Sequence, residues 1–228
     1  MPSHTGPTRS AVRPKEPVAP KLPAALTDAT MPSHEFTDDR EYRELRYKGV
    51  DLSGLRAEVI DVERCRFAGV SLAGTTLRQA GFTDVELDTC DLSATSATRS
   101  QLTRVRVTGS RLAGADWSEC GFHSVVFESC RADLARFRFS TFKHVVFRDC
   151  TLREASFQEA DLRNVRFEDC DLSGAQLSNA RMAGARLSGC VLAGVGGVAS
   201  LAGATVQSRD LSTLARSLAG ALGITIEE

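Results

Sequence analysis

Cysteines are the residues in this chain best suited to chemistry. Seven occur among its 228 residues, and the last four follow one another at intervals of 20. Thiolates can hold zinc, but a structural zinc site needs four ligands arranged as a tetrahedron. No C-x-x-C pair, the spacing typical of zinc and redox motifs, is present. We interpret the cysteines as small buried side chains with reduced thiols, and expect no metal or other cofactor. They are Cys65, Cys90, Cys120, Cys130, Cys150, Cys170 and Cys190.

Histidine is the other residue type that could act in catalysis. The chain has His4, His34, His123 and His144, and none has a nucleophile or carboxylate partner in a recognisable arrangement. The sequence also contains no P-loop, G-x-S-x-G, H-E-x-x-H or dinucleotide-binding fingerprint. We therefore expect no catalytic residues, and the sequence predicts a protein that is not an enzyme.

A period of five dominates the chain that positions these residues. Every fifth residue from Leu52 to Leu192 is apolar, and most are Leu or Phe. The residues two positions earlier are uncharged and only Ala, Val, Cys, Ser, Thr, Leu or Ile. A helix needs recurrence near 3.6 and a strand needs strict alternation. A period of five instead predicts a chain that turns a corner every five residues, with two positions facing inward.

The repeat also has a recognisable consensus. The segments VDLSG (50–54), CDLSA (90–94), ADLRN (160–164) and CDLSG (170–174) are similar to A-(D/N)-L-x-x. The chain thus resembles the pentapeptide-repeat family, and within it the bacterial Qnr-type proteins. This resemblance implies an all-β fold, a right-handed quadrilateral β-helix, in which each coil takes four pentapeptides. We expect it to be followed by a short C-terminal helix.

Such a coil places residues 20 apart in columns. Phe127, Phe147 and Phe167 fall in one column, and Cys130 to Cys190 form a ladder. The register weakens at 131–140, where Leu134 and Phe139 occupy outward positions unless a local bulge buries them. At 195–200 the phase slips by one, so that Leu201 and Val206 take over as inward residues.

Three zones follow from these patterns. All seven prolines lie between Pro2 and Pro32, and we expect residues 1–35 to form a disordered tail whose removal (1–32) leaves the melting temperature nearly unchanged. Residues 36–206 form the β-helix with its N-terminal cap. Residues 207–228 form a helix for capping or dimerisation. Its apolar face is Leu211, Leu214, Leu218 and Leu222.

The surface suggests a partner that is a protein. Outward Val126, Leu134, Phe139 and Val146 lie within about one coil, and a single exposed patch of this kind marks an interface. We expect a non-enzymatic scaffold that mediates protein–protein interaction. The alternative implied by the resemblance is a DNA mimic that binds DNA gyrase or topoisomerase IV and confers quinolone-type antibiotic resistance. Mimicry of a polyanion needs an acidic face, whereas the net charge here is −1.

The sequence carries no apolar run long enough to span a membrane and no apolar segment typical of a secretory signal. We expect a cytoplasmic protein with no direct contact to nucleic acid or membrane. A type II topoisomerase is one possible protein partner, and a homodimer through the C-terminal end is a further expectation.

Overall fold

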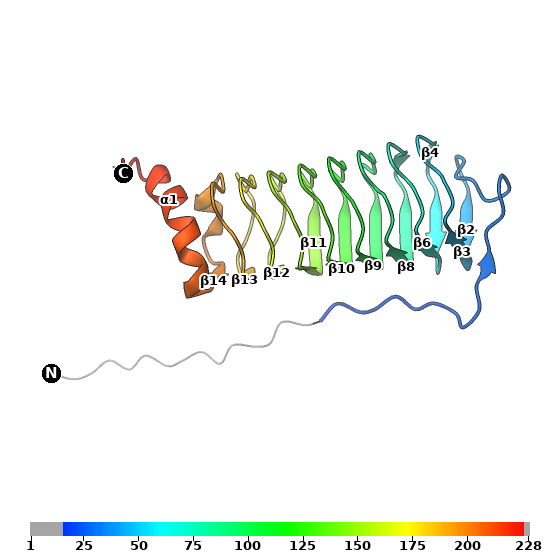
Figure 1. Ribbon diagram of the computed structural model, residues 1–228, viewed down its shortest axis with the longest axis horizontal. Coiled ribbons are helices and arrows are strands. Elements are labelled where there is room, and N and C mark those ends of the chain that lie inside the picture. Colours follow the sequence, from blue (N-terminus) through cyan, green and yellow to red (C-terminus); the bar gives the residue numbers. More distant parts are fainter. Residues whose placement is uncertain (1–15, 226–228) are drawn as a thin grey trace.

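The computed structural model describes residues 16–225 and shows a parallel β-solenoid of about nine turns with one C-terminal helix (Figure 1). The predicted all-β fold class is confirmed. The main sheet runs in the order β1-β3-β6-β8-β9-β10-β11-β12-β13-β14, with every pair parallel. The strands are β1 (Thr27–Asp28), β2 (Glu41–Arg43), β3 (Leu45–Lys48), β4 (Arg56–Glu58), β5 (Asp61–Glu63), β6 (Arg66–Ala68), β7 (Thr76–Arg78), β8 (Gly81–Asp88), β9 (Gln101–Thr108), β10 (Gly121–Glu128), β11 (Thr141–Arg148), β12 (Arg166–Glu168), β13 (Arg186–Ser188) and β14 (Thr205–Val206). The helices are 3-10 turns η1 (Val198–Leu201) and η2 (Ser208–Asp210) and α-helix α1 (Leu211–Ala221).

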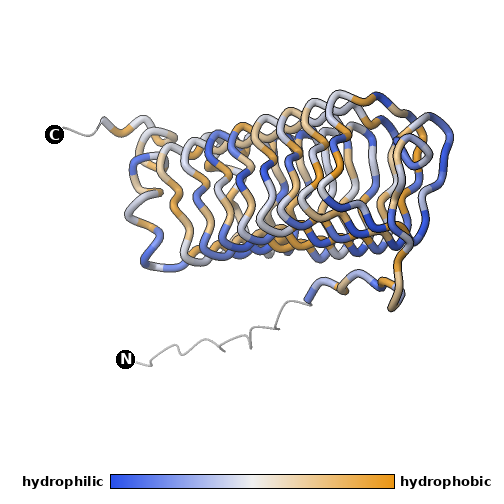
Figure 2. Tube along the Cα trace, turned by 45° about the vertical axis from the view of Figure 1, so that its right-hand side comes forward, coloured by the Kyte–Doolittle hydropathy of each residue, from blue (hydrophilic) through white to orange (hydrophobic). Residues whose placement is uncertain are grey.

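Each coil turns at residues with left-handed backbone. Along one coil these are Ser124, Ser129, Leu134 and Phe139, with φ of 55°, 52°, 60° and 58°. We name the four sides of this coil A (121–124), B (125–129), C (130–134) and D (135–139), and equivalent residues lie 20 positions away in neighbouring coils. Hydrophobic and hydrophilic stretches alternate along each coil accordingly (Figure 2).

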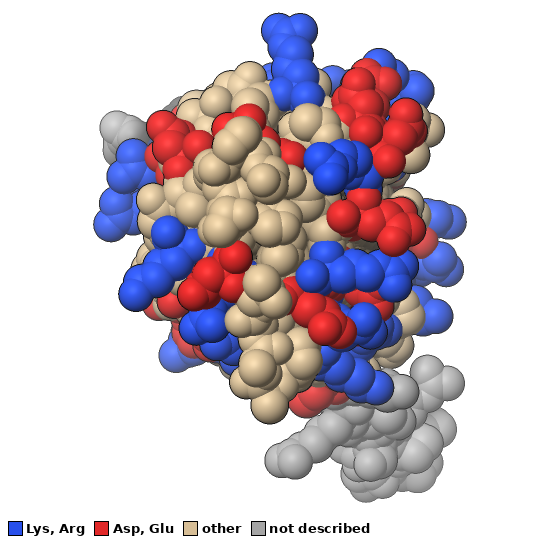
Figure 3. Space-filling model, turned by 90° about the vertical axis from the view of Figure 1, so that its right-hand side faces the viewer, with Lys and Arg blue, Asp and Glu red and all other residues tan. Residues whose placement is uncertain are grey.

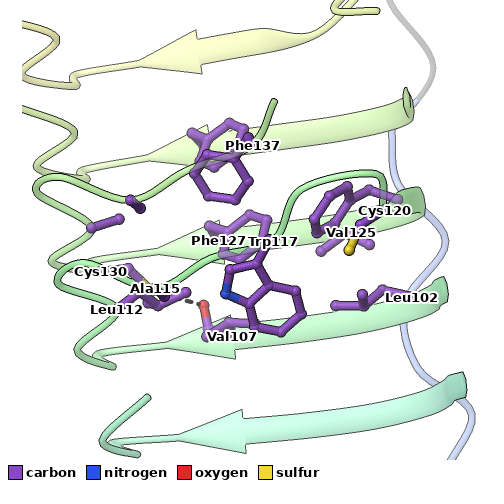
Figure 4. Close-up of a cluster of buried hydrophobic side chains, with 14 of the residues drawn as sticks. Leu102, Val107, Leu112, Ala115, Trp117, Cys120, Val125, Phe127, Cys130 and Phe137 are labelled. Atoms are coloured by element: carbon purple, nitrogen blue, oxygen red, sulfur yellow. Dashed lines mark hydrogen bonds between the residues drawn. The ribbon is translucent and has the colours of Figure 1, made fainter. Parts of the chain in front are cut away.

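Neighbouring coils are in register at a spacing of 20 residues. Phe122 pairs with Phe142 and Phe127 with Phe147 between β10 and β11. Their rings stack with centroids 4.6 Å and 4.8 Å apart. Such stacking fills the core with aromatic and aliphatic side chains, as around Trp117 (Figure 4).

No bulge interrupts residues 131–140. Arg131 bridges both Arg111 and Thr151 at the regular spacing, and Ala132 and Phe137 are buried. Leu134 and Phe139 remain exposed at corners. The alternative prediction, a local bulge that buries Leu134 and Phe139, is therefore wrong.

The predicted cysteine ladder is confirmed, and its hydrogen bonds explain the residue type. Cys150 Sγ donates to the carbonyl of Phe127 at 3.5 Å, and Cys170 Sγ to that of Phe147 at 3.4 Å. Ser140 Oγ makes the same contact with Trp117 at 2.8 Å. The small inward position thus suits a side chain that fills little volume yet satisfies a buried carbonyl of the preceding coil.

The phase slip near residue 200 is also confirmed. Arg186 pairs with Thr205 and Leu187 with Val206, one residue fewer than the usual 20. Val198 is buried in η1, and Leu201 and Val206 are half-buried.

The N-terminal end is closed by an aromatic plug. Phe36 is buried against Tyr42 and Tyr47, with ring centroids 5.0 Å and 6.0 Å away. The hydroxyl of Tyr42 donates to the carbonyl of Glu35 at 2.6 Å, and that of Tyr47 to the carbonyl of His34 at 3.0 Å. The first coil therefore begins on a covered core.

The prediction of a disordered tail is wrong for residues 16–35, and its residues 1–15 lie outside the described part of the chain. Residues 16–26, which we call the strap, run alongside the solenoid toward β3 (Figure 1). They form neither helix nor strand, and β1 then pairs with β3. Proline excluded regular secondary structure here, but it did not prevent docking through side chains.

Helix α1 docks on the last coil through its first turn. Asp210 Oδ2 accepts a hydrogen bond from the amide of Cys190 at 3.1 Å, and Thr213 Oγ1 accepts one from the amide of Leu192 at 3.0 Å. Leu214 is buried. Gly223, with φ of 71°, follows the helix, and the amide of Ile224 bonds to the carbonyl of Ala219.

Candidate protein-interaction surfaces

The four residues predicted to form one apolar patch lie on different parts of the coil. Val126 and Val146 are outward on side B, where Val126 is half-buried and Val146 is only 1% exposed. Leu134, the last residue of side C, and Phe139, the last residue of side D, are the corners that flank side D, the opposite side of the coil. The prediction of a single apolar patch is therefore wrong. The five-residue period predicts which positions point outward, but it does not predict which sides of the solenoid another segment covers.

Leu134 and Phe139 are exposed in a conformation that disfavours them. Their side chains are 57% and 54% exposed, and their φ values of 60° and 58° lie in the left-handed region. Bulky L-residues are uncommon there, and Gly, Asn or Asp are preferred. The guanidinium of Arg138 sits 5.4 Å from the centre of the Phe139 ring. Neither burial nor backbone preference therefore explains these two residue types.

The strap is held on the solenoid at its start and at its middle by charged groups of the coils. Near its start, Glu16 accepts two hydrogen bonds of 2.6 Å from Arg166. Further on, the amide of Lys21 donates to Asp84 Oδ1 at 2.9 Å. Asp84 also accepts two hydrogen bonds of 2.6 Å from Arg104 of the next coil. These groups are separated by up to 150 residues in sequence.

The electrostatics of these contacts favour the charged forms. Burial alone would raise the pKa of Asp84, but hydrogen bonds from Arg104 and the Lys21 amide outweigh it and hold the pKa below its usual value. The hydrogen bonds with Arg166 likewise lower the pKa of Glu16, and they raise the pKa of Arg166. Both contacts thus persist at neutral pH as charge-assisted hydrogen bonds.

Half-buried residues recur every three positions along the strap. Pro17, Pro20, Pro23 and Leu26 are half-buried, and most residues between them are exposed. Three residues per turn is the period of a polyproline II helix. Sequence reasoning missed this surface because it interpreted the proline-rich segment as part of a disordered tail. The P-x-x-P-x-x-P spacing was a signal for the strap's conformation, although not for its docking site.

The predicted apolar face of α1 is divided between two environments. Leu214 is buried toward the solenoid, whereas Leu211, Leu218 and Leu222 are 47%, 39% and 77% exposed. Positions i, i+7 and i+11 share one stripe of a helix. The end of the solenoid thus carries a small exposed apolar stripe.

Many acidic side chains of the solenoid pair with arginines of a neighbouring coil. Figure 3, which looks at the N-terminal end, shows the two signs of charge interspersed. Pairs at the 20-residue spacing are Arg43–Glu63, Arg64–Glu44, Arg66–Glu86, Arg78–Glu58, Arg99–Glu119, Arg104–Asp84, Arg136–Asp116, Arg148–Glu128, Arg148–Glu168 and Arg181–Asp161. The stacking that aligns the core therefore also aligns opposite charges.

The family follows from the repeat. Residues 100–177 and 120–196 match the model of the pentapeptide repeat region, and the same 20-residue register continues on the N-terminal side of them, from β2 onward. Residues 100–196 are thus a pentapeptide-repeat region.

Several solved structures are similar to this chain. HetL of the cyanobacterium Nostoc sp. strain PCC 7120, involved in the regulation of heterocyst differentiation, is 19% identical with a TM-score of 0.37, covering 75% of this chain and 89% of that one. A trypsin-treated variant of QnrB1, a plasmid-mediated fluoroquinolone resistance protein, is 18% identical with a TM-score of 0.37, covering 85% and 100%. No curated protein has a significantly similar sequence.

Burial makes several thiols of the pentapeptide-repeat core harder to ionise. Burial raises the pKa of Cys65 and Cys90 to about 11 and that of Cys120 to about 12, so these thiols are neutral at pH 7. The rings of His123 and His144 are 6.0 Å apart.

Within residues 16–225, no group of three or more His, Cys, Asp or Glu side chains is placed to hold a metal ion. No helix in that range is long and apolar enough to cross a membrane.

Proposed function

We propose that this protein is a non-enzymatic scaffold that docks a protein partner on side D, with Leu134 and Phe139 as anchors. The supporting observation is that both side chains are more than half exposed while occupying left-handed corners that disfavour them. Stability alone would select Gly, Asn or Asp at such corners. A large exposed apolar side chain retained at that cost fits an anchor that is buried only in a complex.

The surroundings of the anchors fit a partner with a mixed polar rim. Arg136 pairs with Asp116 at 3.4 Å, and Arg138 stacks over Phe139. Aromatic residues and arginine are enriched at the centres of protein interfaces. The free, buried thiols support a reducing compartment, and we place this function in the cytoplasm.

The test is affinity capture with three full-length proteins, the wild type and two variants. Wild type and the Leu134→Asn/Phe139→Asn double variant are compared by quantitative mass spectrometry of proteins retained from the native host. The control is Val59→Asn, because Val59 is 48% exposed with φ of 57° but lies four coils from Phe139 in the same corner column. We expect one partner to be lost by the double variant and retained by the control. Identical sets from all three proteins would refute the assignment.

Topoisomerase binding by DNA mimicry has weaker support. Acidic side chains across the solenoid face arginines of adjacent coils. The positive charge of these arginines offsets the negative electrostatic potential that a mimic of DNA needs. A DNA gyrase supercoiling assay with and without a fluoroquinolone separates the two functions. Inhibition or protection at low micromolar protein would favour the mimic, and the scaffold predicts no effect.

The exposed stripe of α1 is the surface for a second copy of the chain. Leu211, Leu218 and Leu222 lie at the free end of the solenoid, where two copies can meet through the same surface. Sedimentation velocity is expected to give a concentration-dependent dimer that Leu218→Glu disrupts. A wild-type chain that stays monomeric at about 100 μM would remove this element of the function.

A further inference from the structure

The strap covers a surface that the repeat itself would leave open. Val146 points outward from β11, in register with Val126 of β10 and Arg166 of β12. It is nevertheless 1% exposed, whereas Arg106 and Arg186 of the same outward column are exposed. The residue beside it, Arg166, carries the bond to Glu16. The burial of Val146 next to this contact indicates that the strap, a segment outside the solenoid, lies against side B here.

The polar groups at this surface are directed at the strap. The Arg166 side chain is 10% exposed, and its two shortest carboxylate contacts are the 2.6 Å bonds to Glu16, whereas Glu168 lies at 3.5 Å. Asp84 is 5% exposed and accepts the amide of Lys21. Without the strap, Arg166 would keep only the 3.5 Å contact with Glu168, and Asp84 would keep its bonds from Arg104 but lose the Lys21 amide. A buried guanidinium that finds its shortest carboxylate contacts in an added segment is a recognition element of a binding site, because a buried charge with a weakened partner is costly.

The occupant has the proline spacing of a known class of recognition peptide. The half-buried Pro17, Pro20 and Pro23 repeat every three residues, as on one edge of a polyproline II helix. Proline has no amide hydrogen, so the donor used here belongs to Lys21, between two of the prolines. Preformed polyproline II segments lose little conformational entropy on binding, which is why P-x-x-P motifs are widely used ligands.

We propose that side B along β8–β12, together with the corner residue Asp84 that precedes it, is a binding site for a polyproline II segment of a partner protein, and that the strap is the chain's own occupant of that site. The ligand has the pattern E-P-x-x-P. Arg166 binds its carboxylate and sets its direction, Asp84 binds a backbone amide, and Val126 with Val146 contacts the proline rings. The tethered strap competes with the partner at an effective concentration in roughly the millimolar range, so the site is masked until the strap is released.

This assignment does not involve Leu134 or Phe139, which lie at the corners of side D. The two proposals can therefore fail separately. Substitutions on side B should leave capture through side D unchanged.

The experiment uses full-length protein and a fluorescent peptide with the sequence of residues 16–26. The receptor is Glu16→Arg, in which the strap has lost its bond to Arg166 while the site is intact. We expect saturable binding in fluorescence anisotropy, about tenfold tighter than to wild type, whose intact strap competes. A peptide with its three prolines replaced by alanine is the control for preorganisation and should bind more weakly.

Charge reversal identifies the site. Arg166→Glu should lose the peptide, and a peptide carrying arginine at position 16 should recover binding to that variant. No saturable binding up to about 1 mM, or equal binding to Arg166→Glu, would overturn the proposal. If the wild type is a dimer that the peptide converts to monomers, the site binds the strap of a second copy of the chain. That result would overturn the proposal that the ligand belongs to a partner protein.

Trypsin cleavage after Lys21 provides a readout that needs no peptide. Release of the strap should be faster in Arg166→Glu than in wild type, and the Glu16→Arg/Arg166→Glu double variant should restore the slow rate. Circular dichroism confirms that each variant is folded. Equal cleavage rates in folded wild type and Arg166→Glu would show that this ion pair does not seat the strap.

Discussion

At the scale of single residues, the corner positions separate structural from functional side chains. Most corners carry Gly or a polar residue, and Val59, Leu134 and Phe139 stand apart as larger apolar ones. Left-handed backbone costs an L-residue roughly 1–2 kcal/mol, and less for Asn. A corner occupied by Leu or Phe therefore points to a requirement outside the isolated fold.

Replacing these anchors should not harm the fold. Leu134→Asn and Phe139→Asn are each expected to leave stability unchanged or raise it by about 0.5 kcal/mol, because Asn tolerates the left-handed region. Urea denaturation measures the change. Phe137→Asn is the matched control, since Phe137 is fully buried on the same side and the variant should lose at least about 3 kcal/mol. A large loss at Leu134 would show that it packs in the isolated protein.

At the scale of elements, the ends of the solenoid show how an open edge is satisfied. Within the coils, the amide of Cys90 bonds to Ser110 Oγ of the next coil at 3.0 Å. At the last coil the amide of Cys190 has no further coil, and Asp210 supplies the acceptor. Asp210 is the residue before α1, but its side chain makes no hydrogen bond to the helix start. It serves the solenoid instead.

Asp210 should therefore matter more than a surface carboxylate. Asp210→Ala leaves the Cys190 amide buried and unpaired, which is expected to cost about 1–3 kcal/mol. The melting temperature should fall by roughly 2–10 °C for a chain of this size. Asp210→Asn keeps an acceptor oxygen and should cost less. Differential scanning calorimetry compares the three proteins, and equal losses for Ala and Asn would contradict the hydrogen-bond explanation.

At the scale of the whole molecule, contacts distant in sequence join the N-terminal segment to the coils. Glu16 reaches Arg166, and the carbonyl of Leu26 accepts a hydrogen bond from Arg46 at 3.1 Å. Strand β1 extends the main sheet by pairing with β3. The segment thus contacts both the first coils and the middle of the solenoid.

Removing this segment should destabilise the protein. Deleting residues 2–32 exposes Val146, breaks the ion pair of Arg166 and removes β1, for an expected loss of at least about 2 kcal/mol. The melting temperature should fall by about 4 °C or more. This reverses the expectation from the sequence of no change. Deleting residues 2–14 keeps every described strap contact and is the control. Equal melting temperatures for the wild type and the 2–32 deletion would mean that the strap adds no stability.

Sequence alone determined the features that repeat from coil to coil. The five-residue period predicted the buried positions from Leu52 to Leu192, the cysteine ladder and the phase slip before Val206. These predictions succeeded because each coil buries the same positions against its neighbours. The requirement for apolar residues at these positions therefore recurs in the sequence with every coil.

Only the tertiary structure decided what lies against the outside of the coils. It separated Val146, covered beside the strap, from the exposed Leu134 and Phe139, and it turned Leu214 inward while Leu222 faces outward. It also joined Glu16 to Arg166. Such contacts occur once, between residues far apart in sequence, so no periodicity records them. Their formation depends on side-chain complementarity that exists only after the solenoid has folded.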